Sequence, residues 1–108
     1  MKAKYMHKGE SLDYRNATDG IIAAGDVVVM GSRIGVAGTD IAPGELGSVH
    51  VSGVYELPKM DKAALDVGTV VYLASDGITT TETDNTIAGY VTAASSAESE
   101  NVWVKINA

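Results

Sequence analysis

An alternating apolar stretch, Gly47–Lys59, directs this chain to a β fold. Read with a period of two residues, its apolar side chains fall on one face and its polar side chains on the other, as in a half-buried strand. The inward-facing set is Val49, Val51, Tyr55 and Leu57. Gly53 shares that face, which suggests a bulge or a close backbone neighbour. Pro58 ends the strand because it cannot donate a ladder hydrogen bond.

Seven further segments have the composition of short strands. Valine, isoleucine, threonine and other apolar residues dominate them, and Gly, Asp, Asn and Pro separate them. These segments are residues 11–16, 27–30, 34–37, 69–74, 78–82, 87–93 and 101–106. With the central stretch they predict a mostly β fold, a small barrel-like β-sandwich of about eight short strands.

One segment has helical spacing. Met60, Ala64 and Leu65 recur at helical intervals between Lys59 and Asp66, and Gly68 follows as a stop signal. We therefore expect one short helix over residues 59–66.

The two halves of the chain resemble each other. The matching pairs are Gly25–Val29 with Gly68–Tyr72, Gly35 with Gly89, and Val49-x-Val51 with Val102-x-Val104. The second half carries extra residues between Ala74 and Ile87. The halves are either two copies of one unit or unrelated valine-rich segments with similar spacing.

The composition limits the core and the chemistry. The chain has 108 residues, which fits one domain, and it contains no Phe, one Trp and no Cys. A core of Val, Ile, Ala, Leu and Met is thin, so burial between subunits would help to stabilise it. The absence of Cys excludes disulfides, thiolate nucleophiles and zinc held by cysteine.

No catalytic, metal or cofactor site emerges from the polar residues. Ser48, His50 and Ser52 share a strand face, but no nucleophile elbow accompanies them, so an ordinary surface histidine is the better interpretation. The other histidine, His7, lies far away in sequence, and no phosphate-binding or calcium loop is present. We expect the protein not to be an enzyme.

The charges divide the chain into a basic arm and an acidic body. The net charge of −6 argues against nucleic-acid binding. Lys2, Lys4 and Lys8 lie with His7 in residues 1–8, while all acidic residues lie in residues 9–108, the expected single β domain. Such an arm suits an acidic partner or a neighbouring subunit, or is a frayed terminus.

The chain shows no sign of membrane insertion or secretion. No apolar run is long enough for a membrane-spanning helix, and the first ten residues lack the apolar segment of a secretory signal. We therefore expect no membrane partner and a location in the cytoplasm of the producing cell.

The order of several motifs resembles a family of small tailed-phage and prophage proteins, the capsid cement or head-decoration proteins. The motifs are Lys8–Tyr14, Ala24–Val29, Ile34–Ala37, Gly44-Glu45, Val49–Lys59 and Gly68–Tyr72. The segment GVYELPK, residues 53–59, is the most specific of them. Members often have a longer, alanine-rich helical segment after this motif, where the chain has only Met60–Asp66.

The resemblance implies a non-catalytic protein on the outside of the icosahedral head in the virion, after assembly in the host bacterial cytoplasm. It implies a homotrimer that stabilises the head by bridging capsomers, with an arm that pairs with a strand of the major capsid protein. The capsid-binding candidates in the arm are Lys2, Lys4, Tyr5, His7 and Lys8. The candidates for a subunit interface are Trp103, which points away from the valine face of its strand, and Tyr55.

A ligand-binding or glycan-binding β module of a phage head or fibre is the alternative. It would need a platform of aromatic side chains. The tyrosines Tyr5, Tyr14, Tyr55, Tyr72 and Tyr90 are scattered along the sequence and do not obviously build one.

Overall fold

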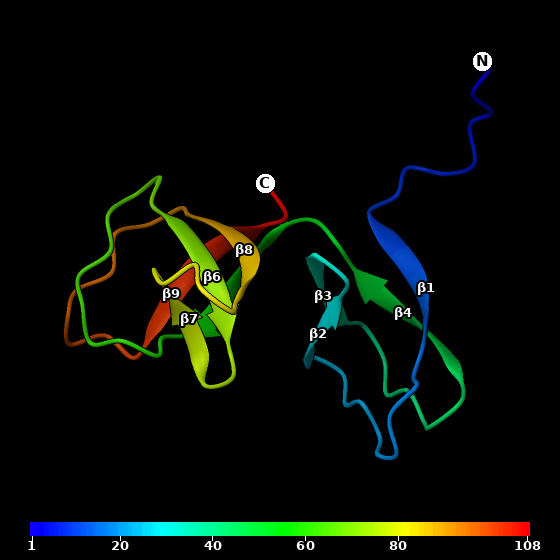
Figure 1. The fold of residues 1–108 in the computed structure, drawn as a ribbon, viewed down its shortest axis with the longest axis horizontal. Helices are drawn as coiled ribbons and strands as arrows, with labels where there is room; N and C mark the ends of the chain where they lie inside the picture. The colour runs from blue at the N-terminus through cyan, green and yellow to red at the C-terminus, as the bar shows by residue number, and fades with distance from the viewer.

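The structure is a computed structural model that describes residues 1–108, and it consists of nine strands without a helix (Figure 1). The strands are β1 (Ser11–Arg15), β2 (Val27–Met30), β3 (Arg33–Ala37), β4 (Leu46–His50), β5 (Val54–Pro58), β6 (Val70–Ala74), β7 (Gly77–Thr79), β8 (Thr86–Val91) and β9 (Asn101–Ile106). The mostly β prediction is confirmed. No helix is present that could serve as a membrane span.

The strands form two antiparallel sheets, one from each half of the chain. The N-terminal sheet has the order β1-β4-β3-β2, and the C-terminal sheet has the order β5-β9-β8-β6-β7. They build two lobes that lie side by side and are joined by the linker Val51–Gly53 (Figure 1). Each sheet is open and keeps two edge strands, so the barrel-like expectation is wrong.

The central stretch Gly47–Lys59 is the crossing between the lobes, and not one continuous strand. β4 pairs with β1 and β3, whereas β5 pairs with β9 in the other sheet. Gly53 lies between them with a φ of 115°, a conformation that glycine adopts without strain, and this turns the chain out of the first sheet. The predicted alternation holds within each part, since Val49 and Leu57 are buried while His50 and Glu56 are exposed.

The predicted helix over residues 59–66 is wrong. Backbone N–H groups of this segment donate to distant carbonyls instead: Lys59 to Glu100 at 2.8 Å, Met60 to Ile78 at 2.9 Å and Leu65 to Ser95 at 2.8 Å. Of its apolar side chains only Leu65 is buried. Since a helix this short is marginal without a packed face, the long-range bonds prevail and hold the segment as a loop.

The two lobes are copies of one unit. In the N-terminal sheet Val27 pairs with Val36 and Val28 with Gly35; in the C-terminal sheet Val70 pairs with Tyr90 and Val71 with Gly89. The registers of β1 with β4 and of β5 with β9 correspond in the same way. The structure therefore supports a repeat and not two unrelated valine-rich segments. β7 and the loop after it are the extra residues of the second copy.

The registers also correct one detail of the sequence match. Val49 pairs with Leu12 and Ala37, and its counterpart is Val104, which pairs with Tyr55 and Val91. The match of Val49 with Val102 in the sequence is therefore wrong by two residues.

Two different polar residues occupy equivalent places at the start of each lobe's first loop. The buried Asn16 donates from Nδ2 to the carbonyls of Gly20 and Ile41, both at 2.8 Å. Its counterpart Lys59 donates from Nζ to the carbonyls of Ala63 at 2.7 Å and Ser96 at 2.8 Å. Each side chain thus ties the loop after it to a more distant loop of the same lobe.

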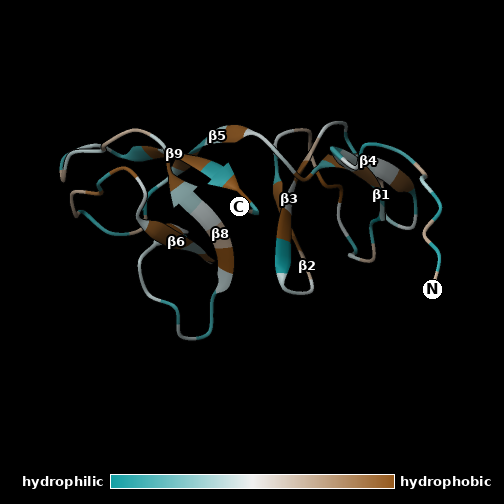
Figure 2. Ribbon diagram, turned by 90° about the horizontal axis from the view of Figure 1, so that it is seen from above, coloured by the Kyte–Doolittle hydropathy of each residue, from teal (hydrophilic) through white to brown (hydrophobic).

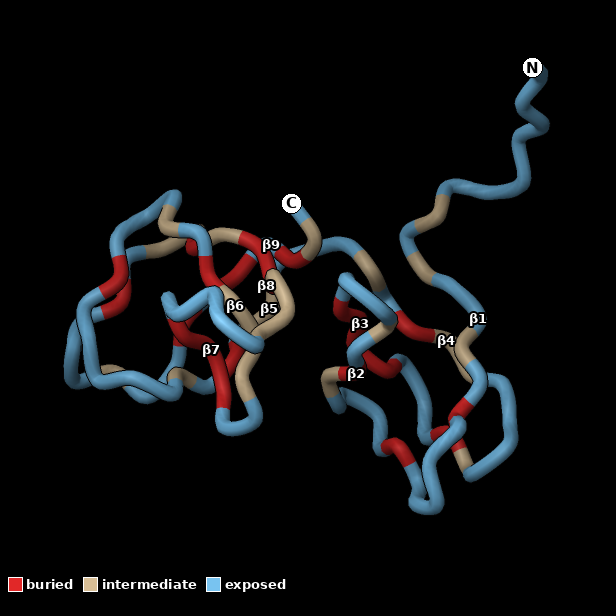
Figure 3. Tube along the Cα trace, viewed as in Figure 1, coloured by how far each residue is buried: buried red, intermediate tan, exposed pale blue.

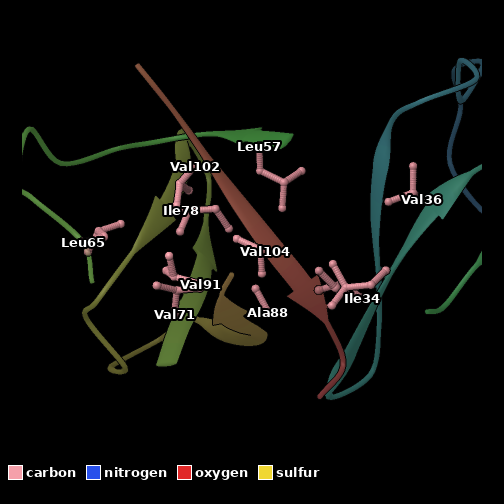
Figure 4. Close-up of a cluster of buried hydrophobic side chains, with 11 residues drawn as sticks. Ile34, Val36, Leu57, Leu65, Val71, Ile78, Ala88, Val91, Val102 and Val104 are labelled. Carbon is pink, nitrogen blue, oxygen red and sulfur yellow. The ribbon is translucent and has the colours of Figure 1, made fainter. Parts of the chain in front are cut away.

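Two clusters of buried side chains form the core. The smaller cluster lies in the N-terminal lobe and contains Ile22, Val28, Ala37, Ile41 and Val49. The larger cluster contains Ile34, Val36, Leu57, Leu65, Val71, Ile78, Ala88, Val91, Val102, Val104 and Ile106 (Figure 4). Figure 3 shows the buried residues in both lobes and the exposed N-terminal segment beside them.

Strand β3 joins the two clusters. We call the face of each sheet that carries its own buried valines the inner face: Val28 and Val49 mark it in the N-terminal sheet, Val71 and Val104 in the C-terminal sheet. Ile34 and Val36 lie on the opposite, outer face of the N-terminal sheet and belong to the core cluster of the C-terminal lobe (Figure 4). Seen from above, the β2–β3 hairpin stands between the C-terminal sheet and the β1–β4 pair (Figure 2).

Candidate functional site

The N-terminal arm, residues 1–8, lies entirely outside the two lobes. All eight residues are exposed and none belongs to a strand. The first backbone hydrogen bond between this end and a lobe comes after the arm, where Val51 N–H donates to the Glu10 carbonyl at 3.0 Å. Figure 1 shows the arm extending away from the body. Its backbone groups are therefore available to a partner.

The arm carries the side chains that the sequence singled out. Lys2, Lys4, Tyr5 and Lys8 are exposed, and Tyr5 is 78% exposed. His7 Nδ1 accepts a hydrogen bond from the Gly9 N–H at 3.0 Å, and Gly9 has a φ of 77°. This turn connects the arm to β1, which is an edge strand of the N-terminal sheet.

Trp103 and Tyr55 lie on opposite faces of the C-terminal sheet. Trp103 is 53% exposed on the outer face, and its indole Nε1 donates to Glu56 Oε2 across the strand pair at 3.2 Å. Tyr55 lies on the inner face, half-buried against the larger core cluster. The sequence placed Trp103 correctly on the wet side of its strand, but the two candidates do not form one patch.

The outer face of the C-terminal sheet collects aromatic and valine side chains that sequence reasoning did not bring together. Tyr72 and Tyr90 share this face with Trp103, because they alternate with the inward Val71 and Val91. Val54 and Val70 add apolar side chains that are 51% and 48% exposed. We call Val54, Val70, Tyr72, Ile87, Tyr90 and Trp103 the outer C face.

The polar candidates weighed for catalysis do not assemble. His50 is exposed on β4 and makes no hydrogen bond with Ser48 or Ser52; its Nε2 lies against the backbone of Gly38. No group of three or more His, Asp or Glu side chains is placed to hold a metal ion.

A groove of about 520 Å³ lies between the lobes. Val27 and Val29 of β2 form one side, and Leu57, Leu73 and Ile78 of the C-terminal lobe lie opposite. Neither Tyr nor Trp lines the groove, so it lacks the stacking surface of a glycan site.

Residues 6–106 match the model of the phage cement protein family, nearly the whole chain. The chain belongs to the phage cement protein family. The predicted resemblance is thereby confirmed, and membership gives the protein a capsid-associated role in the virion. No curated protein and no solved structure matches the chain.

The match extends over both lobes of this cement protein and over the last part of its arm, Met6–Lys8. Lys2, Lys4 and Tyr5 lie before the matched range, so their part in capsid binding stays a prediction from charge and exposure. Sequence reasoning missed the outer C face because it depends on which strands pair. The one local signal was the outward alternation of Trp103.

Proposed function

We propose that this cement protein binds the outside of the icosahedral head of a tailed phage and stabilises it by bridging neighbouring capsomers, without catalysis. It is made in the host bacterial cytoplasm and joins the head there. The observation that carries the proposal is the exposed basic arm, which leaves the body without a hydrogen bond to either lobe before Glu10. Membership of the phage cement family supports the capsid as its partner.

The arm supplies two kinds of contact to the major capsid protein. Lys2, Lys4 and Lys8 present ammonium groups to acidic side chains on the shell, with Tyr5 and His7 between them. The unpaired backbone adds a strand to an exposed sheet edge of the capsid protein, where main-chain hydrogen bonds give affinity. The two contacts reinforce each other, since the charges guide the arm to the surface that its backbone then binds.

The arm is long enough to reach beyond the footprint of its own body. Eight extended residues span up to about 29 Å, and the whole chain, arm included, measures 41 × 38 × 23 Å. A body seated on one capsomer can therefore place its arm on the next. Many copies acting together convert modest single contacts into firm attachment.

The proposed assembly is a homotrimer, which would give each cement particle three arms. The exposed apolar side chains of the outer C face support self-association, since an apolar surface of this kind gains from burial. Trp103 and the exposed part of Tyr55 are the proposed subunit contacts.

Co-sedimentation with purified heads that lack the protein tests this function. Full-length protein is expected to pellet with the heads, and a variant without Met1–Lys8 is expected to stay in the supernatant. The variant's circular dichroism and mass in solution should match those of the full chain, because the arm makes no hydrogen bond to either lobe. Undiminished pelleting of the shortened variant would place the capsid contact on the lobes.

A glycan-binding module is a second candidate, favoured by the shared face of Tyr72, Tyr90 and Trp103. Aromatic side chains on a sheet face can stack on sugar rings. A glycan array separates the two functions: the cement proposal expects no specific binding, and a signal lost in the Trp103→Ala variant would favour the glycan module.

A further inference from the structure

The lobe interface shows how one repeat recognises the next. The outer face of the N-terminal sheet packs against the inner face of the C-terminal lobe. Ile34 and Val36 are 0% and 5% exposed in this contact, and Val27 packs beside them. The contact is heterologous, because an outer face of one repeat meets an inner face of the other.

The outer C face is the equivalent of the covered face and is itself uncovered. By register, Val70, Tyr72, Ile87 and Tyr90 correspond to Val27, Val29, Ile34 and Val36. Val70 is 48% exposed, and the other three are partly exposed. In the first repeat Ile34 and Val36 are buried and Val27 is partly buried, while Val29 at the margin of the contact is 48% exposed. The second repeat therefore leaves Ile87 and Tyr90 partly exposed, whose counterparts the first repeat buries within the chain.

The inner face of the N-terminal lobe is the matching open surface. Three side chains of this face pack against the smaller core cluster but are only partly buried: Tyr14, Met30 and Val51. Leu12 lies beside them and is 40% exposed. Their counterparts in the C-terminal lobe are Leu57, Leu73, Ile106 and Tyr55. Leu57 and Ile106 are 5% and 2% exposed, because the first repeat covers that side.

We propose that the outer C face of one copy binds the inner face of the N-terminal lobe of a second copy, so that subunits associate head to tail. The proposal rests on the self-association included in the proposed function and assigns its surfaces. Trp103 lies in this contact, whereas Tyr55, on the inner face of the C-terminal lobe, lies outside it. The second lobe of one copy then stacks on the first lobe of the next copy, in the same way as the two lobes stack within one chain. A contact of this kind closes into a ring when its rotation divides a full turn, and a trimer would contain six stacked lobes.

The partner is a second copy because the chain contains both halves of the contact. The two uncovered surfaces are of the same kinds as the two that already meet between the lobes. The contact between copies lacks one hydrogen-bonding side chain. Asn107 forms hydrogen bonds across the lobe interface, and the equivalent position in the N-terminal lobe is occupied by Ser52. In addition, the charged Glu56 and Lys105 lie among the apolar side chains of the outer C face. The contact between copies is therefore weaker than the contact within the chain.

Cross-linking tests the assignment directly, since the chain has no cysteine of its own. Val29 and Leu73 line the same groove between the lobes, and their counterparts are Tyr72 and Met30. The double variant Val29→Cys/Leu73→Cys, treated with a short bismaleimide, should link within one chain and run as a monomer. The double variant Tyr72→Cys/Met30→Cys should link between chains and give covalent dimers and larger species.

A charge placed on the outer C face gives a second readout. Val70→Glu should reduce the mass measured by light scattering from the trimer to the monomer. Val67→Glu is the matched control, because Val67 is a similarly exposed valine, 63%, in the loop between β5 and β6. The mass of this variant should stay that of the wild type.

The outcomes separate this inference from the proposed function. A wild-type trimer that gives no cross-link between Tyr72→Cys and Met30→Cys and keeps its mass with Val70→Glu overturns the head-to-tail contact but leaves the trimer. A wild type that is monomeric at every concentration overturns self-association in both forms, while pelleting with heads still decides the cement role.

Discussion

The side chain of Asn107 forms two hydrogen bonds with the backbone of Ile34. Its Oδ1 accepts from the Ile34 N–H at 3.2 Å, and its Nδ2 donates to the Ile34 carbonyl at 2.7 Å and to the Val51 carbonyl at 2.9 Å. The side-chain amide thus replaces the hydrogen bonds of a neighbouring strand, and it connects β3 and the linker to the end of β9. Asn107 has a φ of 58°, a left-handed conformation that asparagine tolerates better than most residues.

Replacing Asn107 should loosen the joint between the lobes. Asn107→Gly keeps the left-handed backbone accessible but leaves the polar groups of Ile34 without their partner, and we expect a loss of about 2–3 kcal/mol in the free energy of unfolding. Asn107→Asp retains the acceptor and loses both donated bonds. Urea denaturation measures both variants. A wild-type midpoint for Asn107→Gly would mean that apolar packing alone holds the lobes together.

Two equivalent glycines should respond very differently to alanine. A Cβ at Gly89 would lie 1.9 Å from the Lys105 carbonyl oxygen, and Gly89 has a φ of 150°. We expect Gly89→Ala to destabilise the protein by at least about 3 kcal/mol. Gly35→Ala meets chiefly the flexible end of Met30 at 3.0 Å and should cost about 1 kcal/mol. Thermal unfolding of the pair tests this, and equal losses would contradict the close approach of β8 and β9.

Reversal of charge in the arm should weaken capsid binding. Two reversals, Lys2→Glu and Lys4→Glu, each remove an exposed attraction of about 0.7 kcal/mol, so we expect roughly tenfold weaker binding to heads at low salt. Added salt should reduce the difference in affinity for heads between this variant and the wild type.

The matched control for the arm is the double variant Arg33→Glu/Lys62→Glu. It changes the net charge equally at two exposed positions of the body. Binding titrations with purified heads should show wild-type affinity for this control. An equal loss in both double variants would mean that overall charge, and not the arm, governs attachment.

Trp103→Ala should affect assembly more than folding. The indole is 53% exposed and makes one hydrogen bond, to Glu56, so the free energy of unfolding of the isolated chain should fall by less than about 1 kcal/mol. If the outer C face is a subunit contact, the mass in solution should fall, with Trp103→Phe retaining more of the assembly. An unchanged mass for Trp103→Ala removes this residue from the interface.

The positions of the strands could be predicted because they depend on local signals. Alternation and turn residues marked every strand segment, and the alternation at Val102 and Val104 placed Trp103 on the exposed side. The arm was equally visible, since its lysines precede the first acidic residue.

The pairing of strands could not be predicted from such signals. Gly53 was recognised as irregular, yet only the assembled sheets show that the chain changes sheet there. The repeat was obscured because Asn16 and Lys59 occupy equivalent places with unrelated side chains. The grouping of Tyr72 with Tyr90 depends on the pairing of β6 with β8, which places Val70 opposite Tyr90 and which no local pattern reveals.

Electron cryomicroscopy of heads decorated with the full-length protein would show where the arm lies. We expect density for both lobes on the outside of the shell, with Met1–Lys8 lying as an added strand against a capsid subunit of the neighbouring capsomer. Density in which the lobes alone touch the shell, with the arm directed into solvent, would contradict this expectation.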